Sequence, residues 1–197
     1  MNNTIIGRLL LAFSCLMTIV IIPAQAADYE IDAKRAHASI DFRIKHLGIG
    51  WVSGRFSEFS GTFSYDSNEP LISTIDVIIN VASVDTNFEP RDHHLRSSDF
   101  FNTDVFPQAH FVSTSFEQGK NDGEFVMHGE FSLHGVTQPL DIAIEKVGEG
   151  ADAWGAYRVG FVGTTSIKMA DYGMNVTRLG PDSQEAFLTL SIEGTRK

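Results

Sequence analysis

Alternation of apolar and polar side chains, with a period of two residues, is the feature of this sequence that most limits its fold. Residues 39–46, SIDFRIKH, place Ile40, Phe42 and Ile44 on one side of an extended chain and three charged side chains on the other. Successive side chains of a strand point to opposite faces, so this pattern is typical of a half-buried strand. No window shows a convincing helical period. The chain is therefore predicted to be all-β.

The same alternation recurs along the chain and predicts about eight strands with antiparallel neighbours. The glycine-rich residues 47–53, which include Trp51, are expected to form a turn, and residues 148–152 another. A bulge near Ser57 or Glu58 is expected to reconcile the faces of the aromatic residues around it. The predicted strands span residues 39–46, 54–65, 71–81, 109–118, 124–133, 140–144, 153–168 and 185–194, with a short strand at 29–33 before them.

A chain of this kind forms either an up-and-down barrel or a sandwich. The strands are long, and their inward faces mix large Phe side chains with small Gly, Ser and Thr. Both features favour a barrel, and an eight-stranded barrel can hold one small ligand inside. We therefore predict an eight-stranded antiparallel β-barrel whose apolar interior contains a ligand. An ordinary filled core remains the alternative.

The N-terminal segment has the pattern of a secretory signal peptide. Arg8 is followed by the apolar run Leu9–Ile22, and the sequence AQA at 24–26 matches a signal peptidase site. The apolar run is shorter than the roughly 18–20 residues that a membrane anchor needs. We expect cleavage after residue 26, which leaves a single domain over residues 27–197.

The charge of the exported part limits its partners. The whole chain has a formal net charge of −10, and loss of the signal peptide with Arg8 would make it −11. Nucleic acid would be repelled, and electrostatic docking on an anionic membrane surface is not expected. The one cysteine, Cys15, lies in the signal peptide, so the exported protein is expected to have no disulfide and no thiolate chemistry.

Residues 90–107, PRDHHLRSSDFFNTDVFP, interrupt the alternation and gather polar side chains. Pro90 and Asp92 suit the first turn of a helix, so one or two short helical turns are expected here. His46 and the pair His93–His94 are the candidate metal ligands or general bases. Adjacent helical residues point about 100° apart, so such a pair rarely binds one ion. No metal site and no catalytic residue are predicted.

Six short motifs in order resemble the YceI family, and together they extend over essentially the whole exported chain. The family often has Phe where Tyr172 stands, which keeps the aromatic character of that position. The motifs are HxSIxFxIxH at 37–46, VSGRF at 52–56, RDxHLRSxDFF at 91–101, FP at 106–107, LxGVT at 133–137 and DYGM at 171–174.

This resemblance implies a lipocalin-like antiparallel barrel, exported to the bacterial periplasm, that encloses a long polyisoprenoid lipid. The implied ligand is an isoprenoid quinone or a polyprenyl phosphate, and the implied role is a carrier or a store. No cofactor and no catalytic residues come with the resemblance. A transient membrane or membrane-protein partner and a homodimer are both left open.

The apolar inward residues of the strands are the candidate ligand-binding positions, together with one phenylalanine of the 90–107 segment. These tunnel candidates are Phe42, Ile44, Phe56, Phe63, Ile75, Val77, Ile79, Phe101, Phe111, Phe131, Leu133, Ile142, Phe161 and Ile167.

Polar residues near the opening are candidates for binding the head of the lipid. His46, Arg91, His94 and Arg96 supply cations or hydrogen-bond donors there, and a network that only braces the loop is the alternative. Two other functions are left open. One is an enzyme that modifies a lipid in the same barrel, with His94 and either Asp92 or Asp99 as acid and base; the other is a ligand-free stress-response or interaction module.

Overall fold

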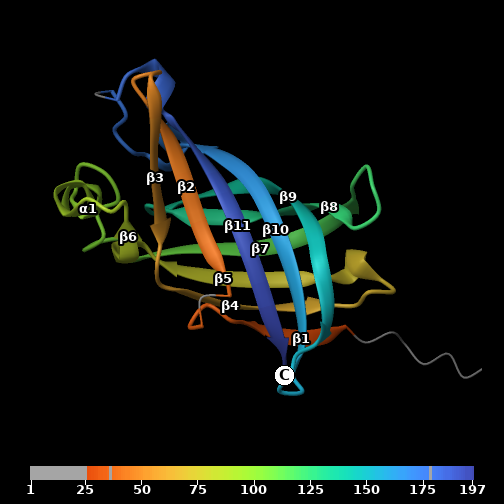
Figure 1. Cartoon of the computed structure of the whole chain (residues 1–197). Helices are drawn as coiled ribbons and strands as arrows, with labels where there is room; N and C mark the ends of the chain where they lie inside the picture. The colour runs from red at the N-terminus through yellow and green to blue at the C-terminus, as the bar shows by residue number, and fades with distance from the viewer. Residues whose placement is uncertain (1–25, 36, 178) are drawn as a thin grey trace, which may run out of the picture.

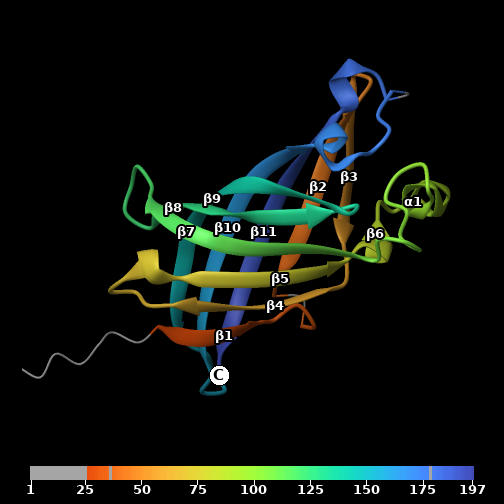
Figure 2. The same cartoon turned by 180° about the vertical axis from the view of Figure 1, so that it is seen from behind.

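The strands form a single antiparallel sheet in which the last strand, β11, pairs with the first, β1, so that the sheet closes on itself (Figures 1 and 2). The computed structural model describes residues 26–35, 37–177 and 179–197. The strands are β1 (Ala27–Ile31), β2 (Ser39–His46), β3 (Gly50–Phe56), β4 (Phe59–Tyr65), β5 (Thr74–Asn80), β6 (Val84–Asp85), β7 (Gln108–Gln118), β8 (Glu124–Leu133), β9 (Val136–Ala151), β10 (Tyr157–Lys168) and β11 (Glu185–Arg196).

Three neighbouring positions of the barrel each hold two consecutive strands. Residues 194–196 of β11 pair with β1, and residues 186–191 pair with β2. At the next position, β4 pairs with β1 and β3 pairs with β2. At the third, β5 pairs with β4 and β6 pairs with β3. Counted by position, the closed barrel has eight antiparallel strands, as predicted. The break between β3 and β4 falls at Ser57 and Glu58, where a bulge was expected.

Helix α1 and the 3₁₀ turns other than η1 lie at one end of the barrel, whereas η1 joins β4 to β5 away from that end (Figure 1). Helix α1 (Glu89–Arg96) begins with Pro90 in its first turn, with Glu89 and Asp92 beside the positive end of the helix dipole. Its position in the 90–107 segment confirms the short helix predicted there. No helix of the described ranges is long and apolar enough to cross a membrane. The 3₁₀ turns are η1 (Pro70–Ile72), η2 (Val81–Ser83), η3 (Met169–Tyr172) and η4 (Pro181–Ser183).

Different structural elements lie at the two ends of the barrel. One end, here the α1 end, carries α1, the β2–β3 hairpin and the segment 169–183 (Figures 1 and 2). The other, here the C-terminal end, carries β1, the end of β11 and the β9–β10 hairpin. These two ends are the reference frame for the cavities and for the surface.

Two phenylalanine rings inside the barrel pack directly against glycines of other strands. Phe63 stacks on Tyr29, with ring centroids 4.9 Å apart, and the Phe63 ring lies against Gly194 so closely that a Cβ there would overlap it. Phe111 lies in the same way against Gly129. The mixture of Phe and Gly that favoured a barrel thus has a packing reason, because the rings need wall positions without side chains.

Two predicted turns differ from the observed ones: the first is shorter, and the second lies at residues 152–156 instead of 148–152. Residues 50–53 belong to β3, so the turn is confined to residues 47–49 and Trp51 faces Lys45 across the β2–β3 pair. Strand β9 likewise continues to Ala151 through its glycines, because the ladder with β10 supplies the hydrogen bonds that their low strand propensity does not. Of the predicted signal peptide, residues 1–25 lie outside the described residues, so its cleavage stays a prediction.

Candidate functional site

Two apolar cavities lie one behind the other inside the barrel. The inner cavity has a volume of about 110 Å³, and the wide cavity, toward the α1 end, about 580 Å³. Ile79, Phe131 and Leu188 line both and form a neck between them. The wide cavity alone has the size of ordinary small-molecule sites, which run from about 300 to 1,000 Å³. The shared lining shows that the two cavities adjoin at these three residues.

The inner cavity is lined without a single charged side chain. Phe161 packs edge-on against Phe63 and Tyr65, with centroids 6.0 and 5.1 Å apart, and strands β5, β7, β8, β9 and β11 add aliphatic and aromatic residues around them. An ion would lose its hydration there without compensation. This chamber therefore suits a hydrocarbon chain and rejects charged groups.

The wide cavity joins an apolar wall to a polar rim. The inward residues of β2 and β3, Phe101 of the 90–107 segment and Met174 of the 169–183 segment form the wall. The rim is formed by polar residues that line the cavity and are at least partly exposed, which identifies them with its opening. These are Lys45, His46, Arg91, His94, Asp99 and Asn175, whereas the polar lining residues Thr86 and Ser183 are buried.

A buried network fixes the guanidinium of Arg91 at this rim. The carboxylate of Asp92, which is 4% exposed, accepts hydrogen bonds from the backbone N–H of Thr86, at 2.9 Å, and from the Thr86 hydroxyl. Arg91 Nε in turn donates to that hydroxyl at 2.7 Å, and Nη2 donates to the Thr86 carbonyl at 2.9 Å. Asp92 therefore holds Thr86 rather than Arg91, and within the described ranges Arg91 has no carboxylate within 4.0 Å.

His94 forms a separate pair at the rim. Its Nε2 lies 3.2 Å from the Asp99 carboxylate, and its ring packs edge-on against Phe100 with centroids 4.9 Å apart. The side chains of His94 and Asp99 are 57% and 67% exposed. Ion pairs this exposed contribute little to stability. The pair is placed at the surface of the opening and away from the inner cavity.

All fourteen tunnel candidates line one of the two cavities, although their contact with a ligand stays a prediction. Those lining the inner cavity are Phe63, Ile75, Val77, Ile79, Phe111, Phe131, Ile142 and Phe161. Those lining only the wide cavity are Phe42, Ile44, Phe56, Phe101, Leu133 and Ile167.

The headgroup candidates divide into three residues at the rim and one outside it. His46, Arg91 and His94 line the wide cavity. Arg96 does not: it donates to Glu89 at 2.7 Å and more weakly to the carbonyls of Ala82 and Val84. Arg96 thus fits the loop-bracing alternative, which sequence proximity could not separate from a rim position.

Several lining residues were not foreseen from the sequence. Thr86 follows the two-residue strand β6, which is too short to show alternation. Met169, Met174 and Leu179 come from the segment between β10 and β11, where the strand pattern stops. The apolar residues of that segment were the available signal, because a solvent-facing connection would be more polar.

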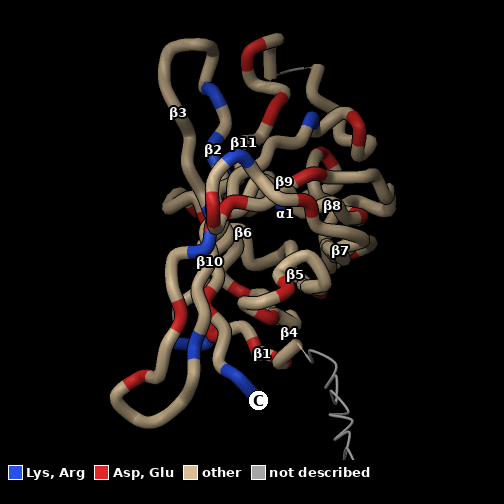
Figure 3. Tube along the Cα trace, turned by 90° about the vertical axis from the view of Figure 1, so that its right-hand side faces the viewer, with Lys and Arg blue, Asp and Glu red and all other residues tan. Residues whose placement is uncertain are grey.

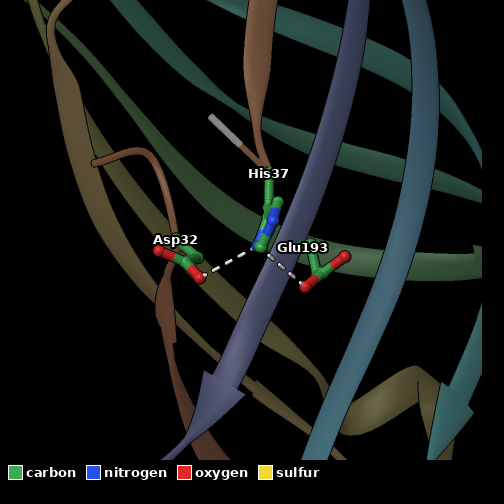
Figure 4. Close-up of side chains that lie close together, drawn as sticks. All are labelled: Asp32, His37 and Glu193. Carbon is green, nitrogen blue, oxygen red and sulfur yellow. Dashed lines mark hydrogen bonds and ion pairs between the residues drawn. The ribbon is translucent and has the colours of Figure 1, made fainter. Parts of the chain in front are cut away.

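A second polar cluster lies near the C-terminal end, where Arg158 is surrounded by acids. Its Nη1 lies 2.8 Å from Asp32 and 2.7 Å from Glu193, and its Nε lies 2.7 Å from Asp152. His37 Nδ1 lies 3.2 Å from Asp32 and 3.5 Å from Glu193 (Figure 4). Because the guanidinium already binds all three carboxylates, the cluster is interpreted as a brace between the β1–β2 connection and β10 and β11, not as a metal site.

The brace changes the acidity of its members. Hydrogen bonds from the Arg158 guanidinium lower the pKa values of Asp32 and Asp152 below their ordinary value. The same contacts raise the pKa of Arg158 itself. All three groups are therefore held in their charged forms at neutral pH.

Comparison with known proteins gives consistent results. A family model described as a YceI-like domain matches residues 29–194. UPF0312 protein Shewmr4_1178 of Shewanella sp. (strain MR-4) is 52% identical over 174 residues, which cover 88% of this chain and 90% of that protein. A Campylobacter jejuni YceI protein of known crystal structure is 28% identical, with a TM-score of 0.69 over 78% of this chain and 90% of that chain.

A more distant likeness concerns the fold alone. The structure described as a polyisoprenoid binding domain from Saccharophagus degradans, implicated in plant cell wall breakdown, superposes with a TM-score of 0.62 at 16% identity. The match covers 88% of this chain and 100% of that one.

Proposed function

The chain belongs to the YceI-like domain family, and on that premise we propose that it is a periplasmic protein that carries or stores a long polyisoprenoid lipid. The observation that carries the proposal is the inner cavity, which no charged side chain of the described residues lines and which adjoins, at the neck residues, a wide cavity with a polar rim. An amphiphile with one long apolar tail and one small polar head matches this division. The description of the Saccharophagus degradans domain as polyisoprenoid-binding supports the same ligand class.

Burial of the tail supplies ample binding energy. At about 0.8 kcal/mol per buried CH₂, a 40-carbon chain gains roughly 30 kcal/mol before any cost. The practical ceiling for non-covalent binding is about 18–21 kcal/mol. Ordering a flexible chain and packing it imperfectly must therefore consume much of the gain. The barrel needs no polar contact along the tail, which agrees with the lining of the inner cavity.

The head of the lipid would lie at the rim of the wide cavity. Arg91 offers a guanidinium whose backbone and hydroxyl contacts fix its position without neutralising its charge. His46 and Lys45 add donors on the opposite wall. Phosphate oxygens or the carbonyl oxygens of a quinone both accept from such groups. The location in the periplasm rests on the predicted signal peptide.

Lipid modification is the second candidate, because His94 and Asp99 form a pair at the rim that resembles an acid–base pair. We instead assign His94 and Asp99 to the opening of the cavity, with no part in a reaction. Their exposure leaves the pair in water, where proton transfer to a lipid gains little from the protein. Asp92, the other carboxylate considered, is buried and directed at Thr86.

Mass spectrometry of an organic extract of the purified protein tests both functions. A polyprenyl lipid in stoichiometric amount supports the carrier or store. An empty extract, together with failure to take up an added long-chain quinone, overturns it. An added lipid that is recovered chemically altered, with the alteration abolished in His94→Gln, would favour the enzyme.

A further inference from the structure

The β2–β3 hairpin ends in an exposed apolar tip beside the opening of the wide cavity. Ile49 is 87% exposed, Leu47 62% and Trp51 47%. Residues 47–51, here the β2–β3 tip, project from the α1 end (Figure 1). Leu47 also lines the wide cavity, as does its neighbour His46. Exposed apolar groups clustered at one projecting point are typical of a contact with a membrane or a partner.

Positive charge accompanies the apolar tip. Arg43 and Lys45 are both exposed on β2, Lys45 also lines the wide cavity, and the Arg43 guanidinium lies 4.5 Å from the centre of the Trp51 ring. Within the described ranges, neither cation has a carboxylate within 4.0 Å. The acid placed against the tip is Asp182, beside Gly48. Figure 3 shows the basic positions of β2 leading toward the tip.

This local charge differs from that of the molecule as a whole. The chain has a net charge of −10, which led us to expect no electrostatic docking on an anionic membrane. Charges are screened beyond about 8–10 Å at physiological ionic strength. A projecting tip therefore responds to its own cations more than to distant acids. An aromatic residue flanked by cations is the composition found where proteins enter the membrane interface.

We propose that the β2–β3 tip docks on a bilayer containing anionic phospholipid and so sets the opening of the wide cavity against the membrane. The proposal rests on the proposed function, because a membrane is where a long-chain lipid is collected or delivered. Ile49 and Trp51 would enter the interface, while Arg43 and Lys45 would lie among the headgroups. The lipid would then pass between bilayer and cavity without exposing its tail to water.

The opposite end of the barrel provides a matched control. Trp154, in the β9–β10 hairpin, is 87% exposed, more than Trp51. Its hairpin holds Glu149 and Asp152, and their cationic partners Lys146 and Arg158 are occupied in ion pairs. An exposed tryptophan without free cations should not dock on an anionic bilayer. Because the chain has two tryptophans, replacing either one leaves the other as the sole reporter.

Tryptophan fluorescence of the purified protein with vesicles tests the proposal. In Trp154→Phe, emission from Trp51 should shift to the blue on addition of phosphatidylcholine–phosphatidylglycerol vesicles and be quenched by brominated lipid. In Trp51→Phe, emission from Trp154 should not change. Vesicles of phosphatidylcholine alone should bind more weakly, and salt should release the protein from the anionic ones.

Two further variants separate the apolar and the charged contributions. Ile49→Ser should weaken vesicle binding at least tenfold or so, since one large apolar side chain leaves the interface. Arg43→Gln, at a cation that does not line the cavity, should weaken it roughly fivefold on anionic vesicles. Trp154→Ser should leave it unchanged. Uptake of a prenyl quinone in solution, without vesicles, reports the proposed function separately and should be unaffected in all three.

Several outcomes would overturn the docking proposal. Wild-type protein that does not bind the anionic vesicles is one, and equal losses in Ile49→Ser and Trp154→Ser are another. If sedimentation shows that the wild type self-associates and that Ile49→Ser abolishes this, the tip is an interface between copies of the chain. Loss of quinone uptake in every protein, including the wild type, would instead remove the proposed function.

Discussion

Arg91 and Thr86 are joined twice, by a hydrogen bond from the guanidinium Nε to the Thr86 hydroxyl and by another from Nη2 to its carbonyl. The side chain is thereby fixed at the wall of the wide cavity. Neither bond neutralises its charge, because Asp92 directs its carboxylate at Thr86. A cation held by neutral partners keeps its capacity to bind an anion or a polarised oxygen.

Replacement of Arg91 should therefore weaken binding of the lipid head. We expect Arg91→Gln to lower the affinity for a polyprenyl phosphate by about 1.5–3 kcal/mol, the usual value of a hydrogen bond to a charged group. Titration by fluorescence quenching would measure it. Arg96→Gln is the matched control, because Arg96 contacts Glu89 outside the cavity. Equal affinities in the two variants would contradict a role for Arg91 in binding.

The neck between the cavities should limit how much tail can enter. Leu188→Trp would fill the neck, so a long-chain quinone should bind at least tenfold or so more weakly, while a short-chain quinone should bind nearly as before. Thr189→Trp, at the next and exposed position of β11, is the control. Uptake of quinones of graded chain length would measure the effect. A uniform loss for all lengths would show that the neck is not on the path.

The Arg158 cluster predicts a loss of stability in acid. The folded-state pKa values of Asp32 and Asp152 lie below the ordinary value of 3.8. Their contribution is therefore present above that value and is lost as the pH falls through the lower folded-state values. The unfolding midpoint should fall over this window. In Arg158→Met it should be lower by roughly 5 °C or more at neutral pH and depend less on acid. An unchanged acid slope would contradict the assignment.

Close approach of rings to glycines predicts a sharp difference between two substitutions. A Cβ on Gly129 would lie 2.6 Å from Cε2 of Phe111, so Gly129→Ala should destabilise the protein by about 1–3 kcal/mol. Gly148 has no atom within 4 Å of such a Cβ, so Gly148→Ala should be neutral or slightly stabilising. Chemical denaturation would measure both. Similar losses of unfolding free energy at the two sites would show that strand propensity, and not ring packing, determines the effect of these substitutions.

Much of the barrel could be predicted because period-two alternation determines both the strands and their inward faces. Strand β2 was predicted with its observed bounds, and the inward residues Phe42 and Ile44 line the wide cavity. The bounds of β3 and β9 were not predicted, since glycines adopt strand geometry when a neighbouring strand supplies hydrogen bonds. The turn propensity of a segment does not indicate whether a neighbouring strand will supply those hydrogen bonds.

The rim was harder to predict than the tunnel. Arg91 and Arg96 are five positions apart on the same short segment, yet one lines the cavity and the other braces the loop. Sequence offers the same charge and similar neighbours for both. Their difference arises because Arg91 contacts Thr86, whereas Arg96 contacts the carbonyls of Ala82 and Val84. Lys45 shows the same limitation, because alternation places it on the face opposite Ile44, yet it lines the wide cavity.

The paired breaks in three adjacent strands divide the barrel into two parts with separate tasks. Strands β1, β4 and β5 form one part, here the hoop, whose β4 and β5 line the inner cavity. Residues 42–56 of β2 and β3, with Thr86 after β6, form the other part, here the extension, which contributes to the wide cavity. Substitutions in the extension alter the rim without touching the hoop that closes through β1 and β11. Under the proposed function, natural variation in the extension would change which head is accepted and leave the compartment for the tail unchanged.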